Sequence, residues 1–433
     1  MKAYRGEILS VPDDPASAGP ASVRYWPDGL LVVEDGLVLA SGPHSGLSEA
    51  LGEVETERLD GLIVPGFVDA HVHYPQVECI ASHGEQLMQW LERHIFPAEK
   101  AFADRGHADR VAAFFLDELL RHGTTSALVF ATVHAGSVDA LFEAALERDM
   151  RIVSGKVLMD LGPDGLRDSV ESGRADTEAL IARWRGRGRL GYAVTPRFAP
   201  TSSAGQLADA GVLVAAHPDV LMHTHLSENP GEIDFVAQRF PDSADYLDVY
   251  DRFGLVGPRS VFAHCVHMSD RALARMAEAG SGVAFCPTSN MFLGSGLFNL
   301  AQADRHGVGI GIGTDVGAGT TLSMLHTLGE AYRTCQLKGA SLDPFRALHF
   351  ATAGAARVMG IGDRVGGLLP GQEADFVLLD PAATPLLARR CAGASLHDRL
   401  FALQILGDDR AVAATYLRGR LAHARAAGPL VSR

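Results

Sequence analysis

The chain has 433 residues, 47% of them hydrophobic and 21% charged, a composition typical of a globular protein with a large buried core. With 38 Lys and Arg against 52 Asp and Glu, the net charge of −14 argues against nucleic acids and anionic membranes as partners, because both need a basic surface. No apolar run is long enough for a membrane span, and five scattered cysteines without a C-x-x-C pair favour reduced thiols, so we expect a cytoplasmic protein.

Both ends of the chain have the alternating pattern of β-strands. Residues 6–11 and 29–40 alternate in this way, and the triplet Glu34-Asp35-Gly36 is a hairpin signal. The pattern returns at residues 374–380 and 411–422. We therefore predict one small flanking β-sandwich domain built from both termini, residues 1–64 and 370–433.

Between these ends, strand-like runs alternate with helical patterns. The strand-like runs cover residues 62–73, 125–130, 151–159, 190–197, 220–225, 260–265, 282–286 and 309–315. The clearest amphipathic stretches between them cover residues 110–121, 138–148, 271–279 and 322–335. Eight such alternations predict an α/β fold, a TIM-like (β/α)8 barrel over residues 65–369, whose catalytic residues would lie at the C-terminal ends of the strands.

The end of the first strand carries two histidines, His71 and His73, in the segment Pro65-Gly66-Phe67-Val68-Asp69-Ala70-His71-Val72-His73. Side chains two residues apart on a strand point to the same face, so both imidazoles can reach one point. Neutral imidazole is the commonest side-chain metal ligand. With 18 histidines in the chain, such a pair also arises by chance, so the other strand ends decide between the two interpretations.

Four other predicted strands also end in chemically capable residues. The fourth ends at Arg197 and Phe198, the fifth at His225 with Glu228 in the loop beyond, the sixth at His264 and the eighth at Asp315. Taken singly, a buried histidine is more often a satisfied core residue, and an aspartate after Gly-Thr is more often a helix cap. In a barrel, however, all these strand ends meet on one face, which favours a catalytic site.

The residue types suit metal-assisted hydrolysis. We predict that His71, His73, His225 and Asp315 hold one divalent transition metal, zinc or alternatively iron, and leave a position for water. Such an ion lowers the pKa of water towards about 7. Asp315 would orient the attacking hydroxide, Glu228 would move its proton, and His264 would donate a hydrogen bond to the attacking oxygen or the substrate.

The motifs PGFVDAHVH, HTHLSE, FAHCVH and GTD, in this order, resemble those of the amidohydrolase superfamily. Residues 367–376 are similar to that superfamily's return into its terminal β-domain, so the likeness covers the whole chain. Many members use two metals bridged by a carboxylated lysine on strand four, but residues 193–203 contain no lysine. The resemblance therefore implies the single-metal branch, which is rich in deaminases of purines, pyrimidines and triazines.

Within that branch, residues 71–76, 195–203, 286–298 and 313–319 are similar to those of the guanine deaminase family. This resemblance implies a small-molecule purine, guanine, as substrate, with deamination to xanthine and ammonia by a homodimeric enzyme. It also implies that Gln76 and Arg197 recognise the ring edge, with donors and acceptors that suit a carbonyl oxygen and ring nitrogens, and that Phe198 packs on the purine. The substrate would also face His73, His225, Glu228 and Asp315.

Several alternatives stay open at this stage. The same machinery could act on cytosine, on a thioadenosine-like nucleoside or on a triazine. An amidohydrolase-like chain can also be a non-enzymatic structural protein, although such chains lose metal ligands and this one keeps the full set. Among the recognition residues, Arg197 could be a structural ion-pair partner, Gln76 a loop cap and Phe198 an ordinary core residue.

Overall fold

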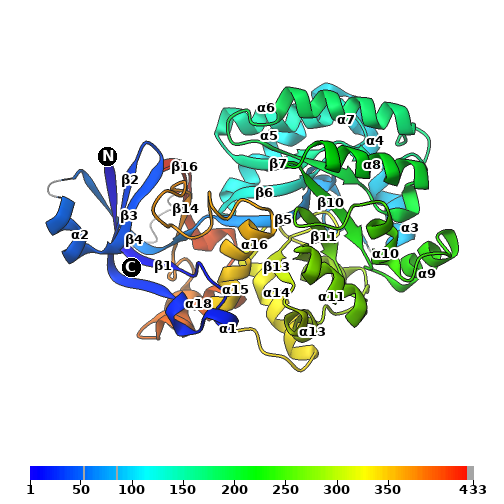
Figure 1. The fold of residues 1–433 in the computed structure, drawn as a ribbon. Coiled ribbons are helices and arrows are strands. Elements are labelled where there is room, and N and C mark those ends of the chain that lie inside the picture. The colour runs from blue at the N-terminus through cyan, green and yellow to red at the C-terminus, as the bar shows by residue number, and fades with distance from the viewer. Residues whose placement is uncertain (52–53, 84–85, 427–433) are drawn as a thin grey trace.

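The computed structural model describes residues 1–51, 54–83 and 86–426, and a parallel β-barrel forms its centre (Figure 1). The barrel strands follow one another around the sheet in chain order. They are β5 Phe67–His73, β6 Thr124–Phe130, β7 Arg151–Gly155 with its continuation β8 Val157–Leu158, β9 Gly191–Pro196, β10 Leu221–Leu226, β11 Ser260–His264, β12 Gly282–Phe285 and β13 Gly309–Ile312. The predicted (β/α)8 barrel is confirmed.

Hydrogen bonds between the first strand and the segment after the last strand bring the two edges of the barrel together. The backbone N–H of Asp315 donates to the carbonyl oxygen of His71 over 2.9 Å, and that of His73 donates to Val316 over 2.8 Å. One layer deeper, the carboxylate of Asp69 accepts from the backbone N–H of Thr314 over 3.1 Å. These bonds lie at the C-terminal ends of the strands, where the candidate ligands are.

Helices cover the outside of the barrel, and the four amphipathic stretches predicted from the sequence are all helical. The helices around the barrel are α5 Arg105–Arg121, α6 Ala135–Arg148, α7 Val170–Trp184, α8 Ala204–Ala216, α9 Pro230–Arg239, α10 Tyr246–Arg252, α11 Asp270–Ala279, α12 Pro287–Phe292, α13 Leu300–His306, α14 Met324–Leu337, α15 Pro344–Phe350 and α16 Ala353–Val358. Helix α5 begins five residues before its predicted start because the Asp104 side chain caps it by accepting from His107 N–H. No helix in the described ranges is long and apolar enough to cross a membrane.

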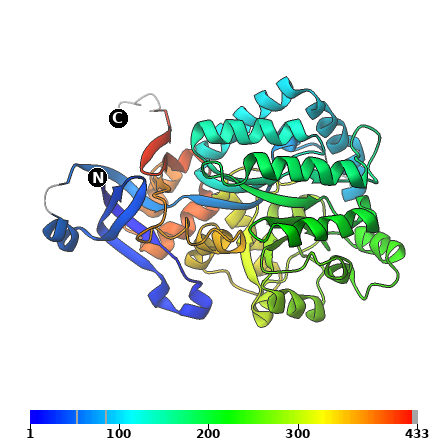
Figure 2. The same ribbon diagram turned by 45° about the horizontal axis from the view of Figure 1, so that its top comes forward.

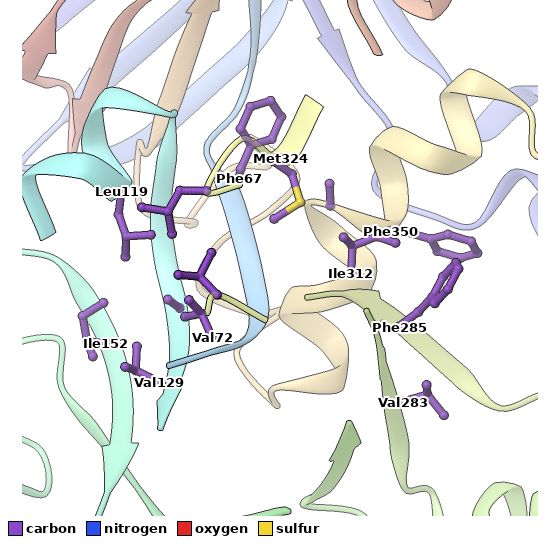
Figure 3. Close-up of a cluster of buried hydrophobic side chains, with 14 of the residues drawn as sticks. Phe67, Val72, Leu119, Val129, Ile152, Val283, Phe285, Ile312, Met324 and Phe350 are labelled. Carbon is purple, nitrogen blue, oxygen red and sulfur yellow. The ribbon is translucent and has the colours of Figure 1, made fainter. Parts of the chain in front are cut away.

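Two apolar layers hold the barrel together. Large side chains fill the space between the strands and the helices, and Figure 3 shows part of this layer, with Val72, Val129 and Ile152 from three neighbouring strands together with Leu119 of α5. Alanine, valine and leucine side chains fill the inside of the barrel, among them Ala70 and Leu128, and helix α16 packs against this inner layer.

The chain termini form one mixed seven-stranded sheet that lies to one side of the barrel (Figures 1 and 2). Its order is β16 Arg420–Ala424, β15 Val412–Leu417, β14 Phe376–Leu379, β4 Thr56–Pro65, β1 Lys2–Ser10, β2 Arg24–Glu34 and β3 Leu37–Pro43. The remaining α-helices of the described ranges come before or after those of the barrel in the chain. They are α1 Pro15–Ala18, α2 His44–Leu51, α3 Leu87–Trp90, α4 Phe96–Lys100, α17 Pro385–Cys391 and α18 Leu396–Leu406. The predicted hairpin forms between β2 and β3, with Asp35 at φ 52° and Gly36 at φ 83°.

The prediction of one strand over residues 62–73 is wrong, because this run divides between two sheets. Val64 of β4 pairs with Val377 of the terminal sheet, whereas Phe67 begins β5 and pairs with Thr124 of the barrel. Pro65 has no N–H to donate, and a Cβ on Gly66 would collide with the Thr125 side chain, so the chain bends here. The division into residues 1–64 with 370–433 and 65–369 stays a prediction, and this change of sheet supports its first limit.

A buried ion-pair cluster joins the two sheets and predicts a stability effect. Arg189, 5% exposed and just before β9, pairs with Asp375 and Glu373, which precede β14. Arg189→Ala leaves Asp375 buried without its cation, so we expect the free energy of unfolding, measured by urea denaturation, to fall by about 3–5 kcal/mol. The exposed control Arg174→Ala, which removes an i,i+4 pair with Glu178, should cost under about 1 kcal/mol. Equal losses in the two variants would contradict this account.

Candidate active site

The four predicted metal ligands come together at the C-terminal end of the barrel. The Nε2 atom of His73 lies 3.1 Å from that of His71 and 3.2 Å from that of His225. The Oδ1 atom of Asp315 lies 3.1 Å from His71 Nε2 and 3.3 Å from His73 Nε2. One ligand atom from each of the four residues lies within 4.8 Å of the other three. The site therefore has three imidazoles and one carboxylate around a single point.

An irregularity in β5 places its two histidines on the inner face. The pairing of β5 with β6 changes register between Asp69 and Val72. Before this shift, Ala70 points into the barrel, and after it Val72 points outward while His71 and His73 point inward. A strand without the shift would place Ala70 and His71 on opposite faces, so this bulge turns the end of β5 towards the site.

The hydrogen bonds around the cluster fit a bound cation. The Nδ1 atom of His225 lies 2.7 Å from the carbonyl oxygen of Arg197 and donates to it, so its Nε2 presents a lone pair to the centre. Burial lowers the pKa of His73 to about 3, so this ring is neutral at physiological pH. Three imidazoles, of which His225 has its Nε2 lone pair towards the centre, and one carboxylate form an N/O set that suits a transition metal.

His223, two residues before His225 on β10, supports the cluster. Its Nε2 lies 2.8 Å from Nδ1 of His71, which positions the His71 ring and leaves the opposite nitrogen of His71 facing the centre. Burial lowers the pKa of His223 well below its ordinary value. A ligating histidine commonly has such a partner on its other ring nitrogen.

Glu228 and His264 lie beside the cluster. Glu228 is 3% exposed, its Oε1 accepts a hydrogen bond from the Ser295 hydroxyl over 3.0 Å, and its Oε2 lies 3.5 Å from His264 Nε2. Burial raises the pKa of Glu228 to about 8, and the charge on Asp315 adds to this effect. Burial alone would also raise the pKa of Asp315, but His264 and His71 hold it well below its usual range. One carboxyl group is therefore poised to carry a proton and the other to stay ionised.

The strand ends at the site have unusual backbone conformations. His264 has φ 71° and Asp315 has φ 51°, both in the left-handed region, which costs about 1–3 kcal/mol for each such residue. The Nδ1 of His264 lies 2.9 Å from Oδ1 of Asn290, which fixes the ring in this conformation. Backbone strain of this kind is characteristic of sites in which side-chain direction matters.

A pocket opens above the cluster, and every residue predicted to recognise the substrate lines it. Its walls are formed by His73, Gln76, Leu87, Trp90, Leu91, Arg197, Phe198, His225, Glu228, His264, Leu293, Asp315 and Ala318. Its apolar residues can pack on a flat ring, and its polar residues can hydrogen-bond to the ring edge. This is the composition expected of a small-molecule site.

Sequence reasoning missed Glu99, which lies behind the pocket wall. This residue belongs to the five-residue helix α4, is 1% exposed, and accepts hydrogen bonds from Gln76 Nε2 over 2.9 Å and from Arg197 Nη1 over 2.6 Å. Arg197 therefore lines the pocket and also has the ion-pair partner considered from the sequence. Leu87, Trp90 and Leu91 were missed as well, although their i, i+3, i+4 spacing is the signal of a helix with one buried face.

Comparisons with known proteins agree with this geometry. Residues 62–422 match the amidohydrolase family. The chain is 49% identical to a guanine deaminase of Escherichia coli (strain K12) over 98% of each chain. Among solved structures, E. coli guanine deaminase superimposes with a TM-score of 0.95 at 48% identity, covering 98% of this chain and 100% of that one. A guanine deaminase from C. acetobutylicum with bound guanine in the active site gives 0.89 at 26% identity, covering 97% and 99%.

The ligand set can be tested by metal content. His264, Cys286 and Asp315 form a second group close enough to hold an ion, so the two groups make different predictions. We expect His225→Ala, measured by inductively coupled plasma mass spectrometry, to lower bound transition metal from about one equivalent to under about one tenth, as loss of one of four ligands should. His264→Ala and Cys286→Ala should keep their metal. Metal loss in these two controls, with retention in His225→Ala, would assign the ion to the second group.

Proposed function

This chain belongs to the amidohydrolase family, and we propose that it hydrolyses guanine to xanthine and ammonia. Its similarity to guanine deaminases extends over nearly the whole chain, and the site has the groups that this reaction needs. The observation that carries the proposal is the position of Arg197 and Gln76 on the wall of a pocket whose floor is the His71–His73–His225–Asp315 cluster.

We propose that these four residues hold one divalent metal ion, zinc in preference to iron. Three imidazoles and a single carboxylate form a ligand set that suits either ion better than calcium or magnesium. When bound, the ion would make a water molecule acidic enough to supply a nucleophile at neutral pH. The hydrogen bond from His225 to the Arg197 carbonyl keeps one ligand in the required tautomer before any ion arrives.

Glu228 is the proposed proton carrier. Its carboxylate takes a proton from the attacking water and delivers it to a ring nitrogen next to carbon 2 of guanine. A further proton transfer converts the amino group to ammonia, the C2–N bond breaks, and the oxygen from water becomes the new carbonyl of xanthine. A carboxyl group with a pKa of about 8 in the metal-free site holds a proton readily, which suits this exchange. The Ser295 hydroxyl fixes one of its oxygens.

His264 and Asp315 are proposed to control the attacking oxygen. The Nε2 of His264 lies 3.8 Å from Oδ2 of Asp315, so both side chains face the same small space above the cluster. Asp315 accepts a hydrogen bond from the attacking water and orients it, and His264 donates one to the oxygen as negative charge develops there.

Recognition of guanine is assigned to the pocket wall. The guanidinium of Arg197 offers fixed donors for the oxygen on carbon 6, and the Gln76 amide offers one donor and one acceptor to ring nitrogens. Phe198, 3% exposed, packs on the flat ring. A homodimer and a cytoplasmic location stay predictions from the sequence.

A substrate panel tests the proposed function against deamination of another heterocycle. We expect purified protein to release ammonia from guanine at least about 100-fold faster, as kcat/KM, than from adenine, cytosine or adenosine, because the bases of adenine and adenosine lack a carbonyl oxygen for Arg197 and cytosine lacks the second ring of a purine. Ammonia release in a coupled assay gives the measurement. Negligible turnover of guanine by protein with a full metal content would overturn the proposal.

The proton carrier can be tested separately. Glu228→Gln keeps the shape of the side chain and removes its basicity, so we expect kcat on guanine to fall by about 10²–10⁴-fold while metal content is unchanged. The same change at Glu178, exposed on α7, serves as the control and should leave kcat within about twofold. A Glu228→Gln enzyme of near normal kcat would remove Glu228 from this role.

A further inference from the structure

Glu99 joins two pocket-lining residues that come from distant parts of the chain. One of its oxygens accepts from Gln76, in the turn after β5, and the other accepts from Arg197, directly after β9. The carboxylate is 1% exposed, and it lies outside the set of residues that line the pocket. It contacts both of these pocket-lining side chains and can act on a substrate through them.

The contacts of Gln76 fix which end of its amide points where. A carboxylate can only accept, so the end at Glu99 must be the NH2 group. A backbone N–H can only donate, so the end that lies 3.3 Å from Gly317 N must be the oxygen. Because both contacts require the same orientation, the amide cannot flip, and it offers the pocket one N–H and one oxygen lone pair in a defined order.

Arg197 is held at both of its ends. Its carbonyl oxygen accepts from His225 Nδ1, and its guanidinium contacts Glu99 and lies 5.4 Å over the ring of Phe96. Phe96 and Glu99 both belong to α4. Helix α4 therefore fixes the plane of the Arg197 guanidinium, and Glu99 balances its charge. A neutral ligand in the pocket then faces oriented N–H donors of a paired guanidinium.

We infer that Glu99 is a positioning residue that sets substrate specificity, because it fixes the Gln76 amide and the Arg197 guanidinium in the one arrangement that reads an oxygen-bearing purine edge. This inference rests on the proposed function. Glu99 would thus determine the preference for guanine over a purine with the same amino group and no oxygen on carbon 6, although it lines no part of the pocket.

The test compares two substrates in the variant Glu99→Gln, which keeps the size of the side chain and replaces one of its two accepting oxygens. Guanine and 2-aminopurine share the reacting amino group, but 2-aminopurine lacks the oxygen on carbon 6. A glutamine at position 99 has one accepting end where the glutamate has two, so Glu99→Gln cannot accept at both of the positions that now face Gln76 and Arg197. We expect kcat/KM for guanine to fall by about 10²-fold and that for 2-aminopurine, which loses only the oriented Gln76 amide, by less than about tenfold, with metal content unchanged.

Two further variants separate positioning from general stability. Glu99→Asp keeps both accepting oxygens on a shorter chain, so it should restore part of the preference for guanine. Glu373 also joins two arginines, Arg151 and Arg189, but it does so at the N-terminal ends of the barrel strands. Glu373→Gln should lower the unfolding midpoint and leave the ratio of the two kcat/KM values unchanged.

Each outcome has one meaning. If the ratio of kcat/KM for guanine to kcat/KM for 2-aminopurine is unchanged in Glu99→Gln, the positioning role is overturned. If Glu99→Gln does not fold, the ratio in Glu99→Asp decides, and an unchanged ratio there overturns the inference. Failure of the unsubstituted enzyme to deaminate guanine would instead refute the proposed function itself.

Discussion

The hydrogen bonds between the first and last barrel strands support the geometry of the whole site. Asp69, fully buried, accepts from the backbone N–H and the hydroxyl of Thr314 and from the backbone N–H of His71. Burial raises its pKa to about 6, so the fold keeps a costly group here for its accepting capacity. Three of the four proposed metal ligands lie within two residues of these bonds, so a displacement of one strand against the other would move most of the proposed ligand set together.

The site contains two carboxyl groups, Asp315 and Glu228, with pKa values shifted in opposite directions. Asp315 faces imidazoles that favour its charged form, whereas Glu228 faces Asp315 and an apolar wall that disfavour charge. Glu99 behind the wall has a third environment, in which Arg197 supplies the compensating charge. The surroundings of the three carboxyl groups therefore suit them to the separate tasks proposed for them, which are ion binding, proton transfer and orientation of neighbours.

The sequence was informative where a residue type and a strand end coincide. His71, His73, His225, His264 and Asp315 all follow apolar runs of strand length, and a barrel must gather such positions on one face. Glu99 gave no such signal, because it lies on a helix of five residues and finds its partners 23 and 98 positions away in the chain. The split of residues 62–73 between two sheets was equally hidden, since one continuous apolar run fits either sheet.

The separation of the ligands along the chain has a consequence for biosynthesis. Asp69 and Thr314, which connect the first and last barrel strands, are 245 residues apart in the sequence. During translation, the two histidines of β5 leave the ribosome long before the aspartate that completes their site. A nascent chain can offer an ion at most a partial ligand set until β13 and Asp315 have been added, so the proposed ion could bind its full ligand set only after the last barrel strand is made. Truncated products that end before Asp315 would leave the ribosome without a complete site.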